Sequence, residues 1–266
     1  MIPVSEAVRM IGRETKRLDA EAVKIGETVG RVLAEDIVAD TDLPPFDRSQ
    51  MDGFAIRSRD TAEAPAALKI VGESAAGRGW TGKLKRGEAV RIMTGAPVPA
   101  GADAVQKIEL TAVETAESIT ILDPVEKGKF IVRKGFEVRK GVKVIPKGAM
   151  VTRNMIATLA AFGYAKVSVS QKPAVAIMGT GSEIVDIAKT PGRDQIRNSN
   201  SVMLKVLAEE CGAATRVLPM VRDSVAGLKK AIASAVEKSD ILVMTGGVSV
   251  GKHDFTKTAL TELGAE

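Results

Sequence analysis

The feature that most constrains the fold is an apolar run that opens into a glycine-rich turn containing hydroxyls and ending on an acid. It occurs at 174–183, which reads AVAIMGTGSE, and again at 241–254, which reads ILVMTGGVSVGKHD. Two helical patterns and one strand-like run lie between the copies, so the order β-α-β-α-β is expected from residue 173 onward. Parallel sheets covered by helices are built in this order. We therefore predict an α/β unit in this part of the chain.

The first helix between the two turns carries clear start and stop signals. It is expected to begin near Asn198, whose short polar side chain can cap free amides, and to end at Gly212. Its apolar residues fall on one face, which we expect to be buried. These residues are Met203, Val206, Leu207 and Cys211.

The second helix is expected to be capped by Asp223 or Ser224. The residues expected to be buried on it are Val225, Leu228, Ile232 and Val236. The strand between the helices, 215–221, contains Pro219, which cannot donate to a sheet ladder. We therefore expect Pro219 at the end of this strand or on an edge.

The turns of such a unit emerge at the carboxyl ends of parallel strands, where open α/β sheets bind ligands. Glu183, Asp223 and Asp254 are therefore expected to converge. Glu183 alone can be a solvated loop acid, and Asp223 alone can be a helix cap. Three acids at three successive strand ends favour a functional role, and Asp254 can hold a hard cation or activate a water molecule. Consecutive glycines, whose amides can approach a ligand closely, suit a phosphorylated small molecule.

Composition narrows the class of protein. The chain has 266 residues, which suggests two or more domains, and its single cysteine excludes an internal disulfide and fits a reducing compartment. No apolar run approaches the ~20 residues needed to cross a bilayer, and the first residues lack the order of a signal peptide. We therefore expect a cytoplasmic protein with no membrane partner.

The net charge of +5 does not indicate a nucleic-acid partner. The lysines and arginines are scattered among acids, and aromatic residues make up 3% of the chain, so stacking platforms are almost absent. A modest positive charge still helps to collect an anionic substrate.

The organisation of the chain changes twice. We expect an N-terminal helical and linker domain at 1–46 and 141–172, an inserted β-rich domain at 47–140, and the α/β domain at 173–266. The N-terminal part is expected to hold two helices, one starting near Ser5 and one carrying Val29, Val32 and Leu33. In the β-rich part, 68–71, 89–93 and 118–122 are expected strands of a small barrel or sandwich. A further helix is expected from Thr152 to Gly163.

Two turns of the β-rich part stand out. Residues 44–55 read PPFDRSQMDGFA, and residues 91–97 read RIMTGAP. By local physics alone both are turn formers, and the Asp52-Gly53 pair is a common hairpin signal.

The motifs together resemble the molybdopterin molybdenumtransferase family, of the MoeA and gephyrin E-domain type. Five motifs occur in the order of that family and span most of the chain. They are PPFDRSQMDGFA at 44–55, MTGAPVPAGADAV at 93–105, GTGSE at 179–183, RDS at 222–224 and TGGVSVGKHDFTK at 245–257. The resemblance implies an enzyme that takes adenylylated molybdopterin and molybdate and cleaves the adenylate linkage with Mg²⁺. Molybdenum is left on the pterin dithiolene, and AMP is released.

The resemblance also assigns residues. The implied catalytic residues are Asp52, Thr94, Glu183, Asp223 and Asp254, of which Glu183, Asp223 and Asp254 are the candidate ligands of Mg²⁺. Glu137 stands where the family often has Asp and is a candidate substrate-binding residue. The other candidates for binding the pterin and its phosphates are Gly179, Thr180, Gly181, Ser182, Thr245, Gly246, Gly247, Ser249 and Gly251. The family forms homodimers in which Asp52 and Thr94 of one subunit would complete the site of the other.

Members of the family continue past residue 266 into a lysine- and proline-rich segment and a further small β domain. On this basis the α/β domain is expected to be incomplete and the chain, taken alone, to be weak in substrate binding and inactive in catalysis. Two alternatives remain open: a nucleotide-processing hydrolase that uses the same α/β module, and a scaffold protein of the gephyrin E-domain type.

Overall fold

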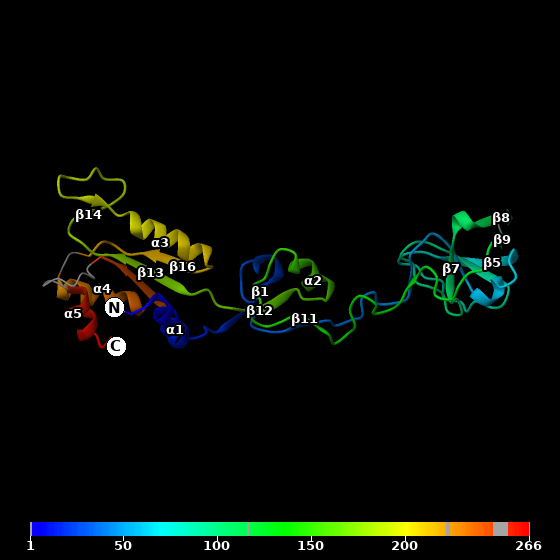
Figure 1. The fold of residues 1–266 in the computed structure, drawn as a ribbon, viewed down its shortest axis with the longest axis horizontal. Helices are drawn as coiled ribbons and strands as arrows, with labels where there is room; N and C mark the ends of the chain where they lie inside the picture. The colour runs from blue at the N-terminus through cyan, green and yellow to red at the C-terminus, as the bar shows by residue number, and fades with distance from the viewer. Residues whose placement is uncertain (1, 116, 222–223, 247–254, 266) are drawn as a thin grey trace. The chain divides into compact units, whose positions relative to one another are not determined.

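The computed structural model describes residues 2–115, 117–221, 224–246 and 255–265 (Figure 1). Contacts divide the chain into two compact units. The α/β unit comprises Met1–Glu35, Lys147–Thr158 and Tyr164–Glu266, and the β-rich unit comprises Asp36–Pro146 and Leu159–Gly163. This two-way division leaves the predicted domain limits (1–46 with 141–172, 47–140 and 173–266) as a prediction. Within the described residues, no helix is long and apolar enough to cross a membrane.

The two units contain short helices and many short strands. The helices are α1 (Val4–Glu14), α2 (Met155–Ala161), α3 (Ser199–Glu210), α4 (Val225–Val236) and α5 (Phe255–Glu262), with 3-10 turns η1 (Ile25–Glu27), η2 (Ser58–Thr61) and η3 (Ile108–Leu110). The strands are β1 (Ala20–Lys24), β2 (Ile37–Val38), β3 (Arg48–Ser49), β4 (Gly53–Ile56), β5 (Ala66–Ser74), β6 (Glu88–Ile92), β7 (Ala104–Lys107), β8 (Thr111–Thr115), β9 (Ser118–Ile121), β10 (Ile131–Val132), β11 (Lys143–Ile145), β12 (Lys166–Ser170), β13 (Ala174–Gly179), β14 (Ile184–Val185), β15 (Ile196–Arg197), β16 (Ala214–Val217) and β17 (Ile241–Thr245). The predicted class, a multidomain α/β protein with a β-rich part and a partial parallel sheet, is confirmed.

The α/β unit contains the predicted parallel sheet. Its strand order is β16-β13-β17, and both neighbours of β13 run parallel to it. Helix α3 contacts β16 and β13, whereas α4 contacts β17 and α5 (Figure 1). The chain therefore passes from β16 on one side of β13 to β17 on the other. The carboxyl ends of β13 and β17 form a topological switch point, the place where such sheets bind ligands.

The elements around this sheet follow most of the local signals. Asn198 caps α3 by accepting a hydrogen bond from the Ser201 amide, and Gly212 beyond its end has a φ of 86°. Ser224 caps α4 by accepting from the Gly227 amide. Strand β16 is an edge strand that ends before Pro219, as predicted.

Some predicted burial on these helices is wrong. Cys211 is exposed, and so are Met203, Val206 and Leu207, although all four were expected in the core. Helix α3 buries instead its Ser201 side, because this small side chain lets the helix lie close to the sheet. On α4, Leu228 and Ile232 are buried as predicted, but Val236 in the last turn is 58% exposed.

The N-terminal part contains one predicted helix and not the other. Helix α1 begins at Val4, close to the expected start. The second helix, predicted around Val29, Val32 and Leu33, is wrong, because Val32 and Leu33 form β-bridges with Met150 and Val169. β-branched residues favour extended backbone, and Gly30, with a φ of 81°, interrupts any helix at this point.

The β-rich unit is built on one six-stranded sheet of order β7-β4-β6-β5-β9-β8. The three predicted strands correspond to β5, β6 and β9. The central strand β4 is buried along its length and contributes to a core on each face, with Phe54 and Ile56 in one cluster and Ala55 in the other. This double burial fixes the start of β4, which follows directly on Asp52 in the motif at 44–55, and the motif that begins at Met93 follows the neighbouring strand β6.

Candidate functional site

The carboxyl ends of β13 and β17 lie side by side. The Thr180 amide donates to the Thr245 carbonyl oxygen at 2.9 Å, and the Thr180 hydroxyl donates to the same oxygen at 3.4 Å. The Val221 amide donates to the Gly179 carbonyl at 3.3 Å, so the segment after β16 joins the same edge. Backbone from three successive parts of the sheet therefore meets at this edge, while the convergence of Glu183, Asp223 and Asp254 stays a prediction.

Close packing at this edge requires glycine at 246, where the contact is with backbone, whereas at 179 the neighbour is a flexible methionine side chain. A Cβ atom added to Gly246 would lie 2.2 Å from the Thr180 carbonyl oxygen, and one added to Gly179 would lie 2.9 Å from the Met220 sulfur. Thr180 is 1% exposed, so its hydroxyl is used inside the sheet. Thr245 is half-buried, and Gly181 and Ser182 continue the turn into solvent.

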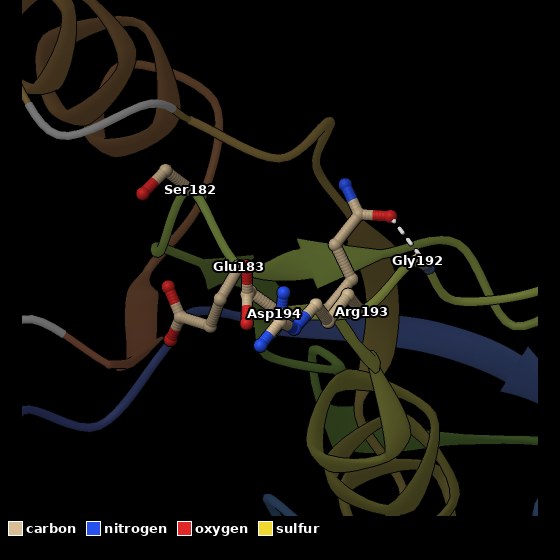
Figure 2. Close-up of a pocket in the computed structure, with 6 residues that line it drawn as sticks. Ser182, Glu183, Gly192, Arg193 and Asp194 are labelled. Atoms are coloured by element: carbon tan, nitrogen blue, oxygen red, sulfur yellow. Dashed lines mark hydrogen bonds between the residues drawn. The ribbon is translucent and has the colours of Figure 1, made fainter.

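Glu183 is the last residue of this turn. A Cβ atom at Gly181 would lie 2.7 Å from its Oε2 atom, so the carboxylate folds back over the glycine backbone. The carboxylate makes no hydrogen bond or ion pair with other described residues and is available to a ligand. It lines an open hollow of about 510 Å³. Figure 2 shows the residues around this hollow. The hollow is lined by Ser182, Glu183, Gly192, Arg193, Asp194 and Gln195.

Several candidates lie outside the described residues: Asp223, Asp254, Gly247, Ser249 and Gly251. Among the described residues, no group of three or more His, Cys, Asp and Glu side chains could hold a metal ion. The Mg²⁺ site assigned to Glu183, Asp223 and Asp254 therefore stays a prediction. What supports it is the position of Glu183 and the meeting of the three strand ends.

The β-rich unit brings Asp52 and Thr94 together. The Thr94 amide donates to Asp52 Oδ1 at 2.6 Å, and the Thr94 hydroxyl donates to the same atom at 2.8 Å. These two bonds lower the pKa of Asp52, the amide contributing more than the hydroxyl. Both residues are exposed, so the pair presents an ionised carboxylate at the surface.

The two loops that carry this pair are tied to each other by their backbones. The Gly95 amide donates to the Ser49 carbonyl at 2.9 Å, and the Ser49 amide donates to the Ala96 carbonyl at 3.0 Å. The buried Ser74 hydroxyl donates to the Pro97 carbonyl at 2.7 Å from below. Asp52 and Thr94 are therefore held in place by the fold and not by their own contact alone.

The Asp52-Gly53 pair is not a hairpin turn, so this interpretation of the sequence is wrong. Gly53 begins β4 between β6 and β7. A Cβ atom there would lie 2.0 Å from the Gln106 carbonyl oxygen, which explains the glycine as a close approach of two backbones.

Glu137 is held in the same unit by an ion pair. Arg48 Nη2 donates to Glu137 Oε1 at 3.3 Å, from the strand β3 that pairs with β10. Nearby, Arg133 donates to Asp47 at 2.6 Å. Burial raises the pKa of Asp47, but the Lys134 amide and then Arg133 together outweigh burial, so the pKa is lowered. Both side chains of the Arg48–Glu137 pair are partly exposed, so the pair is a weak constraint that a ligand can displace.

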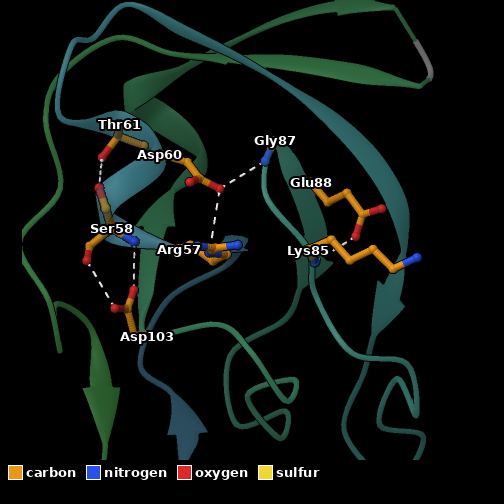
Figure 3. Close-up of polar contacts among 8 residues, drawn as sticks. All are labelled: Arg57, Ser58, Asp60, Thr61, Lys85, Gly87, Glu88 and Asp103. Carbon is orange, nitrogen blue, oxygen red and sulfur yellow. Dashed lines mark hydrogen bonds and ion pairs between the residues drawn. The ribbon is translucent and has the colours of Figure 1, made fainter.

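A second polar cluster of the β-rich unit is structural (Figure 3). Asp103 accepts from the amide and the hydroxyl of Ser58 at 2.6 and 3.1 Å, and Asp60 accepts from the Gly87 amide at 2.9 Å. The Thr61 hydroxyl donates to the Ser58 carbonyl within η2. These acids fix η2 and the turn before β6.

Thr94→Val is expected to raise the pKa of Asp52 toward its usual value, because the hydroxyl donor is lost while the amide donor stays. A carboxylate with a lowered pKa stabilises the fold above its unfolded-state pKa, and this contribution is lost as the pH falls through the folded-state pKa. The wild type therefore keeps the Asp52–Thr94 contact to lower pH than the variant. Carboxyl-carbon NMR titration measures both pKa values. In Thr111→Val, which removes a similar hydroxyl donor elsewhere in the unit, Asp52 should titrate as in the wild type; equal pKa values in Thr94→Val and wild type would contradict the assignment.

The fold defines an α/β protein with a β-rich unit and with a topological switch point, the place where such sheets bind ligands. Residues 2–163 match the family described as the MoeA N-terminal region (domain I and II), and residues 176–266 match a probable molybdopterin binding domain. The chain belongs to the MoeA family.

Similar proteins agree with this membership. The chain is 41% identical over 272 residues to a molybdopterin molybdenumtransferase of Bacillus subtilis (strain 168), covering 100% of this chain and 63% of that protein. It is 40% identical over 258 residues to the protein of the same name from Staphylococcus aureus (strain Mu50), covering 96% of this chain and 61% of that one. The chain thus spans less than two thirds of the length of these relatives.

Solved structures show the same fold. Two crystal structures of the molybdopterin biosynthesis MoeA protein from Pyrococcus horikoshii match with TM-scores of 0.89 and 0.85, each at 34% identity. The matches cover 100% and 92% of this chain and 67% and 66% of those chains.

The hollow beside Glu183 includes residues that sequence reasoning missed. They come from the segment 184–197, in which β14 pairs in parallel with β15. The signal in the sequence is slight, because it consists of one apolar pair at 184–185 and one apolar residue, Ile196, at the start of the second strand.

Proposed function

We propose that the protein to which this chain belongs inserts molybdate into adenylylated molybdopterin, with Mg²⁺-dependent release of AMP. The observation that carries the proposal is the position of Glu183. It follows the turn at which the β13 and β17 strand ends meet, and its carboxylate lines a hollow and makes no hydrogen bond or ion pair with other described residues. Family membership supplies the reaction class, since the relatives named above are molybdopterin molybdenumtransferases. The single cysteine fits a reducing compartment, and we place the reaction in the cytoplasm.

The residues at the strand ends suit a phosphorylated substrate. The Thr180 amide already donates to the Thr245 carbonyl, so Thr180 is not assigned to the substrate. The other backbone amides of the glycine turns at 179–182 and after Thr245 would hold the phosphate oxygens, because successive amides in such turns form an anion-binding concavity. Glu183 has the oxygen ligands that Mg²⁺ prefers, and with Asp223 and Asp254 it would hold this ion. When bound, Mg²⁺ would neutralise charge on the phosphoryl oxygens of the substrate. The same acids would orient a water molecule for attack on the phosphoryl group. The water oxygen would bond to phosphorus as the phosphorus–oxygen bond of the adenylate linkage breaks, the molybdopterin phosphate and AMP would separate, and the two water protons would pass to the products and to solvent.

Asp52 and Thr94 have a separate role in the proposal. The hydrogen bonds from Thr94 hold the ionised Asp52 carboxylate at the surface, on two loops that are joined to each other by backbone hydrogen bonds. We assign this pair to the active site of a second subunit in a homodimer, with Glu137 as a further contact to the pterin. The ion pair of Glu137 with Arg48 would exchange for the substrate contact.

The test is AMP formation from adenylylated molybdopterin by the purified protein. AMP release is expected with Mg²⁺ and molybdate together, is expected to stop after chelation of the metal, and is expected to return when Mg²⁺ is added back. A plain adenosine dinucleotide serves as the control substrate and should release no AMP. Release that persists without Mg²⁺ and molybdate, or that occurs equally with the dinucleotide, would favour a nucleotide hydrolase and overturn the proposal.

A further inference from the structure

The segment 184–197 forms the wall of the hollow opposite Ser182 and Glu183. Strands β14 and β15 at its two ends pair in parallel, and the Ile196 amide donates to the Glu183 carbonyl at 2.9 Å. The Asn198 amide donates to the Val185 carbonyl, also at 2.9 Å. The segment therefore returns to the strand-end turn and is fixed to the backbone of Glu183 itself.

Side chains brace the segment from within. Arg197 Nε donates to the Ile187 and Lys189 carbonyl oxygens, each at 3.1 Å. Gln195 Oε1 accepts from the Gly192 amide at 3.0 Å. Two polar side chains are thus used to hold the loop in one shape. A fixed loop presents its remaining side chains at defined positions, which a binding site requires.

The remaining charged side chains of the lining are unused. Arg193 and Asp194 are exposed and form no ion pair with other described residues. Arg197 differs, because it donates hydrogen bonds to two carbonyl oxygens of the loop. Figure 2 shows Glu183, Arg193 and Asp194 gathered around the same hollow. The hollow therefore offers one guanidinium and two carboxylates on opposite loops.

We propose that Arg193 binds the phosphate of a nucleoside monophosphate in this hollow and is a specificity-determining residue of the site. The inference deepens the proposed function and rests on it. A guanidinium presents a planar fork of donors that matches phosphate oxygens, whereas carboxylates cannot contact a phosphate without a cation between them. Arg193 is the cation among the residues that line the hollow. Arg193 would donate to the phosphate oxygens. Glu183 and Asp194 would lie toward the Mg²⁺ that neutralises the same phosphate.

Calorimetric titration of the protein with AMP tests this assignment. Arg193→Gln is expected to weaken AMP binding at least about tenfold, because a charge-assisted pair contributes roughly 1.5–3 kcal/mol and each 1.4 kcal/mol is a factor of ten. Arg193→Lys should recover part of the affinity, because the charge returns without the fork. Lys189→Gln is the matched control, since it removes the same charge from the same segment at a residue that does not line the hollow. Adenosine, which lacks the phosphate, should bind wild type and Arg193→Gln equally.

Two results would overturn the assignment: wild-type AMP affinity in Arg193→Gln, or an equal loss in Lys189→Gln, which would indicate a general charge effect. Arg193 is exposed, so unchanged thermal unfolding of the variant confirms that the fold is intact. The outcome is separable from that of the proposed function. Weakened AMP binding without any AMP release from adenylylated molybdopterin would leave the Arg193 site standing and remove the transferase proposal. Normal Mg²⁺-dependent AMP release with unchanged AMP affinity in Arg193→Gln would support the transferase proposal and remove the Arg193 site.

Discussion

Gly53→Ala is expected to destabilise the β-rich unit by about 3 kcal/mol, the upper end of the usual cost of overpacking. The added Cβ atom would lie 2.0 Å from the Gln106 carbonyl oxygen and 2.9 Å from Lys107 Cα. Both contacts are with backbone, so no rotamer change can relieve them, and β4 must move away from β7. Gly53 adjoins Asp52, and the same movement is expected to weaken the Asp52–Thr94 contact.

Urea unfolding followed by tryptophan fluorescence measures this effect, because the single tryptophan, Trp80, belongs to the β-rich unit. Gly87→Ala is the matched control in the same unit. Gly87 has a φ of 74° but no atom within 4 Å of an added Cβ, so only the left-handed backbone is penalised, by about 1–2 kcal/mol. A Gly53→Ala protein no less stable than Gly87→Ala would show that the β4–β7 contact yields more easily than its geometry indicates.

The motif around Gly53 shows what local reasoning can and cannot supply. Asp-Gly predicts a turn because both residues tolerate turn backbones, and this reasoning places Asp52 correctly in a loop. It fails for Gly53, since a backbone from a strand about 50 residues later in the chain lies against it. A glycine required by a distant contact cannot be distinguished in one sequence from a glycine required by its own φ.

The parallel sheet was predictable because its signals are local and repeated. Each apolar strand ends in a turn, α3 and α4 each have a capping residue, and the strand expected near Pro219 ends before it and lies at an edge. Parallel order then places the strand ends together without knowledge of any contact. The hydrogen bonds between Thr180 and Thr245 are the direct outcome.

The segment 184–197 was not predictable for the opposite reason. Its strands are two residues long, which is too short for any hydrophobic period. Its shape depends on Arg197 and Gln195 donating to and accepting from main-chain groups inside the loop. Sequence reasoning had no pattern from which to place Arg193 beside Glu183.

The exposed face of α3 illustrates a further limit. Apolar periodicity predicts that a face is covered, but it does not say by what. Met203, Val206 and Leu207 form the predicted stripe, yet they are 53%, 49% and 48% exposed, because the small Ser201 side of the helix is the one that meets the sheet. Burial of a helix face is decided by the neighbour and not by the helix alone.

Gly246→Ala is expected to have the largest effect on the strand-end site. An added Cβ atom would lie 2.2 Å from the Thr180 carbonyl oxygen, and the φ of 86° at this residue is unfavourable for any other side chain. The backbone strain of about 1–2 kcal/mol and an overpacking cost of roughly 1–3 kcal/mol act together. Relief requires the ends of β13 and β17 to separate, which breaks the hydrogen bond from the Thr180 amide to Thr245. AMP binding should therefore be lost as well.

Unfolding of the α/β unit can be followed by helical far-UV circular dichroism, because α3, α4 and α5 all belong to it. Gly264→Ala is the control, since Gly264 has a φ of 81° in the same unit but no atom within 4 Å of an added Cβ. The control should lose about 1–2 kcal/mol of stability and keep its affinity for AMP. If Gly246→Ala bound AMP as the wild type does, the nucleotide would lie away from the junction of β13 and β17, and the ligand site would have to be sought elsewhere on the sheet.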